Sequence, residues 1–600
     1  MKLKIIYIYL AIMVGIFSIP ACEDYLDVSP DLGLDDEEVY SNYETFQGVI
    51  AHAYWTLHNY AYDPHDWDSE IGTLSDEAQH LSTNSKPIAN VANQGLWQDF
   101  DWIEFGFDYN WSEGDPERKL RKQPAGEAVV GIRMVNLALE NLDKLENFPD
   151  LANFTPEEMK RHLEGEARLI RAWHYFQIIQ RYGGIFFMNR SFESTDLVDS
   201  TRRSYQECTD WLISDLDKAA ELLPKNWPVN FEGRATVTTA KAIKSMALLY
   251  AASPNMNMFD GGANAYNLTR AQEAAEAALE TLAAAENSAY YRMLPLAEYK
   301  QNWCSATSGI SYEALWGPPQ SNANAPTATS AGNGWYNPHW DGGWAVWSGP
   351  TQNAVDKFET VNGLAIEDDP VYNPQDPFIN RDPRLDMFVY KNGDNMYISS
   401  PSNKPATLEA WNGGYHDLQA KTVGLWTGYL HRKHRWDGAN NVDNVAGVKR
   451  IFPLIRYAQV YLDFAEAANE AVGPTTAISA GGKTMTAVQA LNVVRSRVGM
   501  PDVDPMYTGS KEALRERIRN ERFVELYQEM HRWHDLRRWR IADEVLKEIY
   551  RADILKSGST IIYNKEEIEG ARVFEERHYW YPFPNSEMRQ VENFTQNPGW

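Results

Sequence analysis

The sequence predicts a mainly α-helical fold with one large, irregular, loop-rich region in its middle. Helix-start signals recur over about residues 36–290 and again over about residues 455–600. Over about residues 291–454, Gly, Pro, Asn and Trp dominate, helical periodicity fades, and only short extended pieces are predicted. A loop-rich insert of this length is usually functional. We therefore expect two distant parts of the chain to form one helical body that carries an irregular layer.

The first residues have the layout of a secretory signal. Two lysines precede fifteen mostly apolar residues, 5–19, and Ala21 is the small residue at the predicted cleavage point. Fifteen residues are too few to span a bilayer core, so residues 1–21 are predicted to be a signal that is removed. Ile19-Pro20-Ala21-Cys22 resembles a loose lipobox, and we predict that the Cys22 thiol receives a lipid that anchors the chain. The alternative is a plain signal followed by an accidental cysteine.

Composition limits the class of protein. No second apolar run approaches membrane-spanning length, so the lipid would be the only anchor. The formal charge of −27 repels phosphate backbones, and nucleic acid is not an expected partner. Cys208 and Cys304 allow one disulfide at most and do not have metal-ligand spacing. Cys208 falls in a helical pattern and is expected to be a buried thiol.

Capping signals predict where individual helices begin. Ser or Thr followed three residues later by Glu or Gln forms a capping box, and Gly or Pro after the last apolar position ends a helix. Helices are predicted to start after Thr155, Thr236, Thr269, Thr486 and Ser510, and a helical pattern also covers Tyr205–Leu223. The helix after Thr155 is predicted to end at Gly183-Gly184, the helix after Thr236 at Ser253-Pro254, and the helix after Thr486 at Gly499. The helix after Ser510 is expected to run through Met530.

Ordered sequence blocks run along nearly the whole chain. The most recognisable is Gly165–Phe176, which is followed by Arg181–Gly184. The other blocks are Gly233–Thr236, Ala251–Pro254, Arg381–Leu385, Ile455–Ala458, Ala465–Glu470, Asn492–Gly499, Asn520–Arg522, Asp535–Trp539, Tyr581–Pro584 and Gln596–Gly599. In content and order these blocks resemble those of the SusD/RagB family of Bacteroidetes outer-membrane lipoproteins.

The resemblance implies a right-handed superhelix of tetratricopeptide-like helix pairs over residues 22–600, with a loop-rich ligand-binding insert. It also implies a lipid-anchored outer-membrane protein that faces the cell exterior, binds an oligosaccharide or polysaccharide and delivers it to a SusC-like TonB-dependent barrel. The acidic residues that follow Cys22 resemble the surface-export signal of such lipoproteins. Relatives of the RagB type handle peptides, so a peptide ligand stays open. The glycan, its linkage, the number of sites and the docking residues are not specified by the sequence.

A tryptophan-rich segment in the irregular region is the best candidate for the ligand site. Pro338 and Gly342-Gly343 make a continuous helix improbable there, and the spacing of the rings does not alternate as in a strand. An indole face can stack on a pyranose ring while amides and carboxylates bind its hydroxyls. The candidate rings are Trp335, Tyr336, Trp340, Trp344 and Trp347, and the candidate polar groups are Asn333, Asn337 and Asp341. The alternative is that these rings form the core of the loop itself.

Two earlier segments supply further candidates. Trp97 and Trp102, with Asp99 and Asp101 beside them, are expected to reach solvent, and Trp67 is a third possibility. From Phe105 to Trp111 the aromatic residues alternate, which predicts an extended segment that packs against the scaffold.

Charged motifs leave an enzyme open as the second alternative. A glycoside hydrolase needs two carboxylates, and the pairs weighed for this role are Asp66/Asp68, Asp76/Glu77 and Asp99/Asp101. Neither a nucleophile elbow nor a zinc-protease helix occurs, and we expect no catalytic residue, cofactor or metal. Gly481–Thr484 has the tail of a phosphate loop but is expected to be a solvated loop, and Glu367–Asp369 lacks calcium-ligand spacing. The helical charges Arg168, Arg171, Glu521, Arg522, Glu525, Arg537 and Arg538 are predicted to pair within the scaffold.

Overall fold

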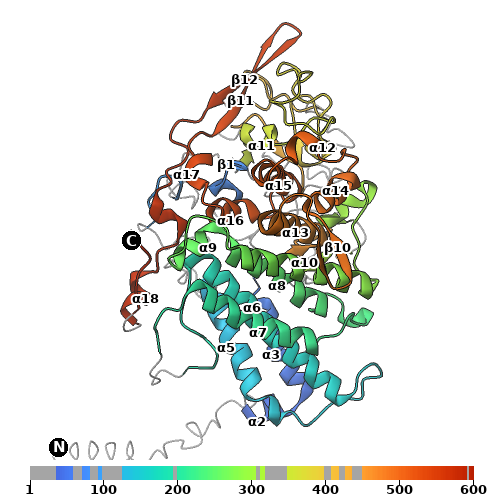
Figure 1. The fold of residues 1–600 in the computed structure, drawn as a ribbon, viewed down its shortest axis with the longest axis vertical. Coiled ribbons are helices and arrows are strands. Elements are labelled where there is room, and N and C mark those ends of the chain that lie inside the picture. The colour runs from blue at the N-terminus through green and yellow to red at the C-terminus, as the bar shows by residue number, and fades with distance from the viewer. Residues whose placement is uncertain are drawn as a thin grey trace, which may run out of the picture.

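Stacked helices dominate the structure, a computed structural model in which the mainly α-helical prediction is evident (Figure 1). The residues that the structure describes are 36–57, 71–80, 92–97, 124–192, 199–305, 311–317, 348–396, 407–417, 426–434, 449–590 and 594–600. The longer helices are α3 (Tyr43–Trp55), α5 (Pro124–Glu140), α6 (Pro156–Tyr182), α7 (Tyr205–Leu222), α8 (Val237–Ala252), α10 (Leu268–Ser288), α13 (Tyr457–Val472), α14 (Ala487–Arg497), α15 (Lys511–Glu525) and α16 (His531–Arg538). The shorter helices are α2 (Asp36–Ser41), α9 (Pro254–Phe259), α11 (Gln352–Asp356), α12 (Pro383–Phe388), α17 (Ala542–Val545) and α18 (Asn585–Gln590).

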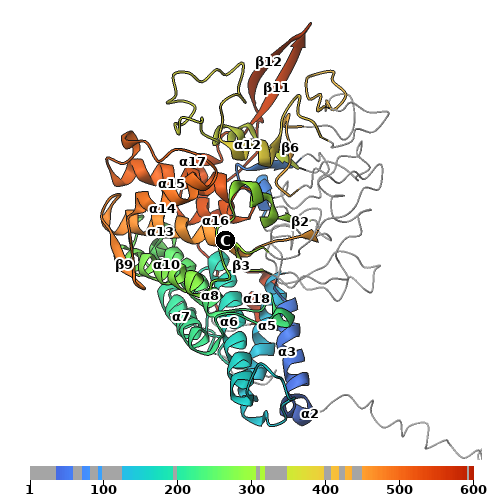
Figure 2. The same cartoon turned by 90° about the vertical axis from the view of Figure 1, so that its right-hand side faces the viewer.

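Most of the longer helices pack against their neighbours in chain order, as in a helical repeat array. The series runs α3, α5, α6, α7, α8, α10, and then α13 with α14 and α15. Helices α10 and α13 therefore lie side by side although the whole irregular region separates them in the sequence. In Figure 2, α7, α10 and α14 lie on the left-hand side, and α3 lies towards the right.

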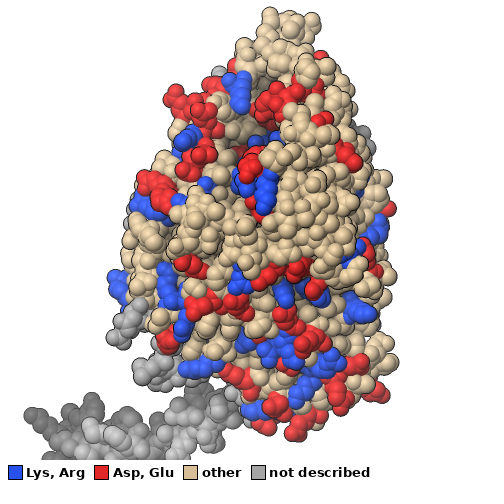
Figure 3. Space-filling model, viewed as in Figure 1, with Lys and Arg blue, Asp and Glu red and all other residues tan. Residues whose placement is uncertain are grey.

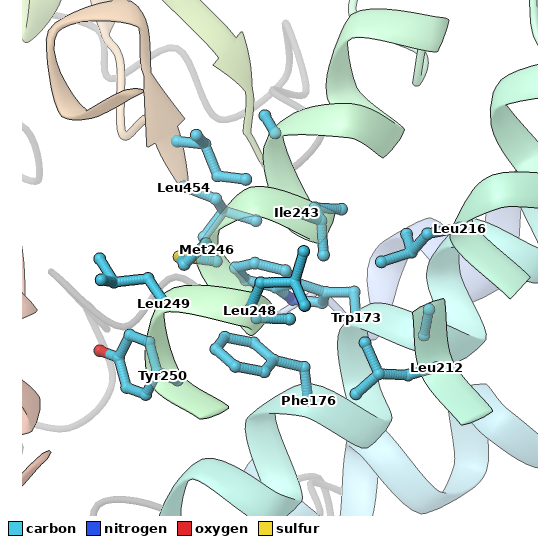
Figure 4. Close-up of a cluster of buried hydrophobic side chains, with 14 of the residues drawn as sticks. Trp173, Phe176, Leu212, Leu216, Ile243, Met246, Leu248, Leu249, Tyr250 and Leu454 are labelled. Carbon is cyan, nitrogen blue, oxygen red and sulfur yellow. The ribbon is translucent and has the colours of Figure 1, made fainter. Parts of the chain in front are cut away.

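The core of this array is built from the apolar faces of consecutive helices. Trp173 and Phe176 of α6 meet Leu212 of α7 and Ile243 and Leu248 of α8, and these side chains are almost fully buried (Figure 4). Burying an aliphatic or aromatic side chain of this size stabilises the fold by about 1.5–3 kcal/mol. Cys208 of α7 belongs to the same core as a free thiol, which confirms its predicted burial, and burial raises its pKa to about 11.

Local capping explains where most helices begin. Thr155 and Thr486 form the predicted capping boxes, Thr236 caps its helix as predicted and forms a further box with Thr239, and Ser510 accepts a hydrogen bond from the Ala513 N–H. The predicted start of helix α10, after Thr269, was wrong. Its N-cap is Asn267, whose side chain accepts from the Arg270 N–H, so Thr269 lies inside the first turn.

The helix that begins after Ser510 does not reach Met530 as predicted. It ends at Glu525, and the following turn places Gln528 and Met530 at positive φ, +58° and +73°. This turn aims the Glu529 carboxylate at Arg456, 2.6 Å away, and the Gln528 N–H at the Glu77 carboxylate, 3.0 Å away. Buried polar groups need such partners, and their tertiary contacts outweigh the local preference for a longer helix.

The strands are short and pair only two by two among the described residues. The antiparallel pairs are β1 (Ala78–His80) with β4 (Ser348–Pro350), β2 (Cys304–Ser305) with β7 (Lys449–Arg450), β3 (Ala314–Trp316) with β8 (Ile455–Arg456), β5 (Val389–Tyr390) with β6 (Leu430–His431), β9 (Ile478–Ala480) with β10 (Lys483–Met485), and β11 (Tyr550–Ser557) with β12 (Thr560–Glu567). The β11–β12 hairpin projects as an arm in Figures 1 and 2. Strands β2 and β6 lie on the right-hand side of Figure 2, away from the outer helices.

Partly exposed ion pairs join the outer helices. Lys244 of α8 pairs with Asp217 of α7 at 2.6 Å, and Lys241 of α8 pairs with Glu280 of α10 at 2.7 Å. In Figure 3, Lys and Arg lie among Asp and Glu over the lower half of the molecule, while a band with few charged side chains crosses the middle. On this face the net negative charge is therefore interspersed with basic side chains.

Candidate functional site

Most of the residues predicted to bind ligand lie outside the described residues. These are Trp67, Asp99, Asp101, Trp102, Asn333, Trp335, Tyr336, Asn337, Trp340, Asp341, Trp344 and Trp347. The lipid-attachment candidate Cys22 and the Phe105–Trp111 segment also lie outside them. What the structure gives is the scaffold from which the three aromatic segments, residues 58–70, 98–123 and 318–347, begin and end.

Trp97 is a core residue, which corrects the prediction that its ring reaches solvent. Its side chain is 3% exposed, and its ring stacks on His578 at 4.6 Å and on the C-terminal Trp600 at 5.8 Å. The indole N–H donates to the Ala92 carbonyl at 3.0 Å. Because Trp97 lies directly before residues 98–123, its packing fixes where that segment leaves the scaffold.

The segments 58–70 and 318–347 begin from the same place in the scaffold. Tyr54 near the end of α3 and Trp316 of β3 meet edge to face, with ring centroids 6.3 Å apart. Both rings are buried, and the Tyr54 hydroxyl donates to Glu166 at 2.8 Å. The chain enters the two aromatic segments a few residues after each of these rings.

Strand β4, which begins directly after residues 318–347, pairs with strand β1. In this antiparallel pairing Ser348 lies opposite His80, ten residues after residue 70. The Thr351 N–H donates to the Glu77 carbonyl at 3.2 Å, which extends the pairing beyond the strands. The residues that lead into the two segments therefore meet, and the strand that follows residues 318–347 is fixed against β1.

The residues that precede the third segment, 98–123, are hydrogen-bonded to the same scaffold. The Asn93 amide donates to the Thr73 carbonyl at 3.0 Å, and the Val573 N–H donates to the Asn93 carbonyl at 2.6 Å. Thr73 lies between residues 58–70 and strand β1. These bonds place residues 92–97, which lead into residues 98–123, beside residues 71–74, which follow residues 58–70.

A cluster of buried ion pairs lies beneath the strands of the irregular layer. Its basic members are Arg384, Lys433, Arg456, Arg495 and Arg497, and its acidic members are Glu313, Glu359, Asp382, Glu521, Glu525 and Glu529. All of these residues except Arg497 are buried, and the Arg497 side chain is itself only 4% exposed. The cluster fastens the irregular layer to α15, so these charges have a structural role.

The helical charges predicted to pair within the scaffold have partners there. Arg522 pairs with Asp463 and Asp535, Arg538 pairs with Glu466, and Arg171 pairs with Asp215. Arg537 donates to the backbone carbonyl of Tyr579 at 2.7 Å.

The one carboxylate pair of the hydrolase alternative that is described cannot reach a substrate. Asp76 and Glu77 are each 1% exposed. Burial acts to raise the pKa of Asp76, but its two-pronged ion pair with Arg532, at 2.7 and 2.9 Å, holds that pKa below its usual value. Burial raises the pKa of Glu77 to about 8. The pairs Asp66/Asp68 and Asp99/Asp101 lie outside the described residues.

Two histidines at the β1–β4 and β6 strands are neutral at ordinary pH. Burial lowers the pKa of His80 to about 4 and that of His431 to about 3. The His431 ring lies between the Ser348 hydroxyl, 3.2 Å away, and the Tyr527 hydroxyl, 3.1 Å away. Ser348 is itself buried, so this chain of hydrogen bonds fixes β4 against β6 instead of presenting a nucleophile.

Sequence reasoning missed one exposed tryptophan beside these segments. Trp55 is 58% exposed at the end of α3, three residues before residue 58. The helical period could have found it, because the buried positions Phe46, Ile50 and Ala53 define the inner face of α3 and Trp55 falls outside that face. We add Trp55 to the candidate ligand-binding residues.

Other chemical motifs are structural or absent in the part of the chain that is described. Gly481 and Gly482, at φ +59° and +78°, form the turn of the β9–β10 hairpin, so the phosphate-loop likeness has no structural counterpart. Among the described residues no group of three or more His, Cys, Asp or Glu is arranged to hold a metal ion. None of the described helices is long and apolar enough to cross a membrane.

Two family models match the chain in non-overlapping segments. A model described as the SusD family matches residues 306–600. A SusD-like model described as "starch-binding associating with outer membrane" matches residues 24–249. Together they leave residues 1–23 and 250–305 unmatched.

Individual relatives agree with these matches. SusD-like protein P38 of Formosa agariphila is 24% identical over 562 residues, which are 91% of this chain and 94% of that protein. The crystal structure of a SusD-like protein from Bacteroides fragilis has a TM-score of 0.68 and 23% identity, covering 94% of this chain and 98% of that one. The structure of a SusD-like carbohydrate-binding protein from the same species has a TM-score of 0.63 and 21% identity. The match covers 92% of this chain and 99% of that one. The predicted tetratricopeptide-like, mainly α-helical fold is confirmed, and the chain belongs to the SusD/RagB family.

Proposed function

We propose that this protein is a surface-exposed outer-membrane lipoprotein that binds a glycan, performs no chemistry on it, and delivers it to a SusC-like TonB-dependent barrel. The observation that supports glycan binding most directly is the contact between Tyr54 and Trp316, the described residues that lead into the two aromatic segments. Trp67 lies in one segment and Trp335 to Trp347 lie in the other, so rings from both would serve one ligand. The "starch-binding" description of the family model and the carbohydrate-binding relative from Bacteroides fragilis support the same class of ligand.

The residues of these segments suit a sugar in their chemistry. Indole faces attract the weakly positive C–H face of a pyranose, and Asn and Asp side chains exchange hydrogen bonds with its hydroxyls. Trp55, exposed at the start of the first segment, extends this set of rings.

The charges of these segments favour a neutral glycan. Residues 58–70 carry four acidic side chains and no Lys or Arg, and Asp341 is the only Asp, Glu, Lys or Arg in residues 318–347. Acidic surroundings in a chain of net charge −27 repel sulfated and uronic-acid polymers. We therefore propose an uncharged polysaccharide as the ligand.

The glycan is tested with the mature chain on native gels that contain soluble starch, laminarin, xylan, mannan or no polymer. Retention by at least one polymer, with an affinity measurable by calorimetry, is the expected result. Failure of every polymer to retain a folded sample would contradict the proposal. Quenching of tryptophan fluorescence by oligopeptides but not by oligosaccharides would establish the peptide-binding alternative, and reducing ends released from a retained polymer would establish the hydrolase alternative.

The lipid anchor is tested at Cys22. The wild-type chain, expressed in a Bacteroidetes host with an alkyne-labelled fatty acid, should carry the label and remain with the outer membrane. Cys22→Ala should lose the label. A labelled Cys22→Ala chain would contradict the predicted attachment site.

The partner is tested by affinity purification of the tagged lipoprotein from solubilised outer membranes. A stable complex is expected to bury more than ~1,200 Å². A large TonB-dependent barrel should co-purify in stoichiometric amount. Its absence, in a sample that still binds glycan, would contradict the delivery step alone.

A further inference from the structure

Two tyrosine rings meet at the surface beside the end of α10, at residues that the sequence did not single out. Tyr312, just before β3, is 48% exposed, and Tyr290, just after α10, is half-buried. Their ring centroids are 5.4 Å apart and their planes cross at 67°, so the rings meet edge to face. Tyr290 packs on the buried Tyr291, with ring centroids 5.1 Å apart, so Tyr312 is the ring of this pair that is presented to solvent.

The backbone that carries Tyr312 is held firmly. Its carbonyl accepts a hydrogen bond from the Arg292 N–H at 3.0 Å. The next residue, Glu313, is fully buried and receives guanidinium groups from Arg456 at 2.7 Å and Arg497 at 2.9 Å. The exposed ring therefore projects from backbone that is already held in place by hydrogen bonds and ion pairs. Stacking of a ligand on this ring would cost the protein little conformational entropy.

Polar groups surround the two rings. The Arg292 guanidinium lies 5.5 Å from the centre of the Tyr312 ring and pairs with Glu298 at 2.6 Å. Both charged side chains remain accessible, at 47% and 37% exposure. Burial, and then the Glu232 carboxylate, raise the pKa of Tyr290, so its hydroxyl stays protonated. Donors and acceptors thus lie beside an aromatic face, which is the combination that binds a pyranose.

The size of the patch excludes a stable protein interface as its purpose. Two aromatic side chains bury at most about 150–250 Å² each, whereas a specific protein interface buries about 1,200–2,000 Å² in total. Leu296, at 37% exposure, adds little apolar surface. One or two sugar rings are the ligand that fits this area.

We propose that Tyr312 and Tyr290 form a second, surface glycan-binding site, separate from the tryptophan-rich segments. Tyr312 stacks on one pyranose ring, and Arg292 and Glu298 bind its hydroxyls. The class of ligand rests on the proposed function. A second contact on one long polymer raises the apparent affinity through effective concentration, without being needed for a short oligosaccharide.

The test compares Tyr312→Ala with a matched variant, Tyr550→Ala. Tyr550 also has a cation over its ring, Lys565 at 4.2 Å, but lies on the β11–β12 arm. Retention by starch, laminarin, xylan and mannan is measured on native gels, and the affinity for the tetrasaccharide of the retaining polymer is measured by calorimetry. Tyr312→Ala should weaken retention by about fivefold or more and leave the tetrasaccharide affinity nearly unchanged. Tyr550→Ala should match the wild type in both assays.

Hydroxyl-radical footprinting of the wild-type chain provides a readout that needs no variant. The retaining polymer should protect Tyr312 from oxidation and leave Tyr550 unprotected. Unchanged retention of Tyr312→Ala together with an unprotected Tyr312 would overturn this site while the proposed function stands. Equal losses for polymer and tetrasaccharide would also overturn it, because Tyr312 would then belong to the main site. No retention of the wild type by any polymer would overturn both.

Discussion

The carboxylate of Glu313 lies 2.7 Å from the guanidinium of Arg456, although 143 residues separate them in the chain. Glu529, which lies in the turn after α15, accepts a hydrogen bond from the same guanidinium at 2.6 Å. This contact joins the start of β3, which leads into the tryptophan-rich segment 318–347, to the helical scaffold. The buried ion-pair cluster thus sets where the predicted ligand-binding segment leaves the scaffold.

Replacing Glu313 should destabilise the fold strongly. Glu313→Gln leaves Arg456 and Arg497 with less compensating charge in the interior, and we expect a loss of about 3–5 kcal/mol in the free energy of unfolding. Urea unfolding followed by far-UV circular dichroism measures it. The matched control is Glu280→Gln, which removes a partly exposed ion pair with Lys241 and should cost at most about 1 kcal/mol. Similar losses in the two variants would show that the cluster contributes little.

The contribution of Glu77 to stability should fall as the pH rises from about 4.3, the ordinary pKa of a glutamate, to about 8, the pKa of Glu77 in the fold. In this window the folded chain keeps the Glu77 proton and the unfolded chain releases it. Rising pH therefore stabilises the unfolded state relative to the folded state. The Glu77 contribution is at most about 1.4 kcal/mol per pH unit. Glu77→Gln should remove it, and Glu280→Gln should not. Parallel pH profiles for Glu77→Gln and the wild type, from urea unfolding, would refute the role of Glu77.

Trp97→Ala should unfold the C-terminal aromatic cluster. The ring packs on His578 and Trp600, and emptying its site is expected to cost about 3–5 kcal/mol. The melting temperature should drop by several degrees, and Trp97→Phe should recover part of the loss. A variant with normal stability and reduced glycan affinity would restore Trp97 as a ligand-facing ring.

Trp55→Ala should lower the affinity for glycan and leave the stability of the fold nearly unchanged, unlike Trp97→Ala. Because its ring is mostly exposed, we expect stability within about 0.5 kcal/mol of the wild type. Glycan affinity, measured by calorimetry, should fall by about 1 kcal/mol or more through the loss of a stacking face. Leu268→Ala, which removes an exposed apolar side chain from α10, is the control and should leave the affinity unchanged. Equal affinities for all three chains would remove Trp55 from the site.

Binding should favour uncharged polymers at low salt. The acidic segments repel sulfated and uronic-acid chains, and added salt screens that repulsion within a Debye length of about 10 Å at 0.1 M. Native gels with laminarin and alginate at low and high ionic strength compare the two classes. Stronger retention by alginate at low salt would contradict a neutral ligand.

Local signals in the sequence determined much of the scaffold. Thr155, Thr236, Thr486 and Ser510 cap helices as predicted, since a cap depends on atoms within one turn of chain. Arg538 pairs with Asp535 at the helical spacing i, i+3, whereas its partner Glu466 and the Arg522 partner Asp463 come from α13. The ordered blocks were sufficient for the family and its mainly α-helical fold.

Tertiary structure alone decided which rings are buried and which segments meet. Trp97 is covered by Trp600, which comes from the other end of the chain, and no local pattern could give that contact. The break after Glu525 likewise depends on buried partners such as Arg456 and Glu77. Burial and ion pairing are set by groups that lie close in space, whereas helix caps and hydrophobic periods are set by groups that lie close in sequence. The helices could therefore be predicted, while the place where the aromatic segments begin and end required the fold.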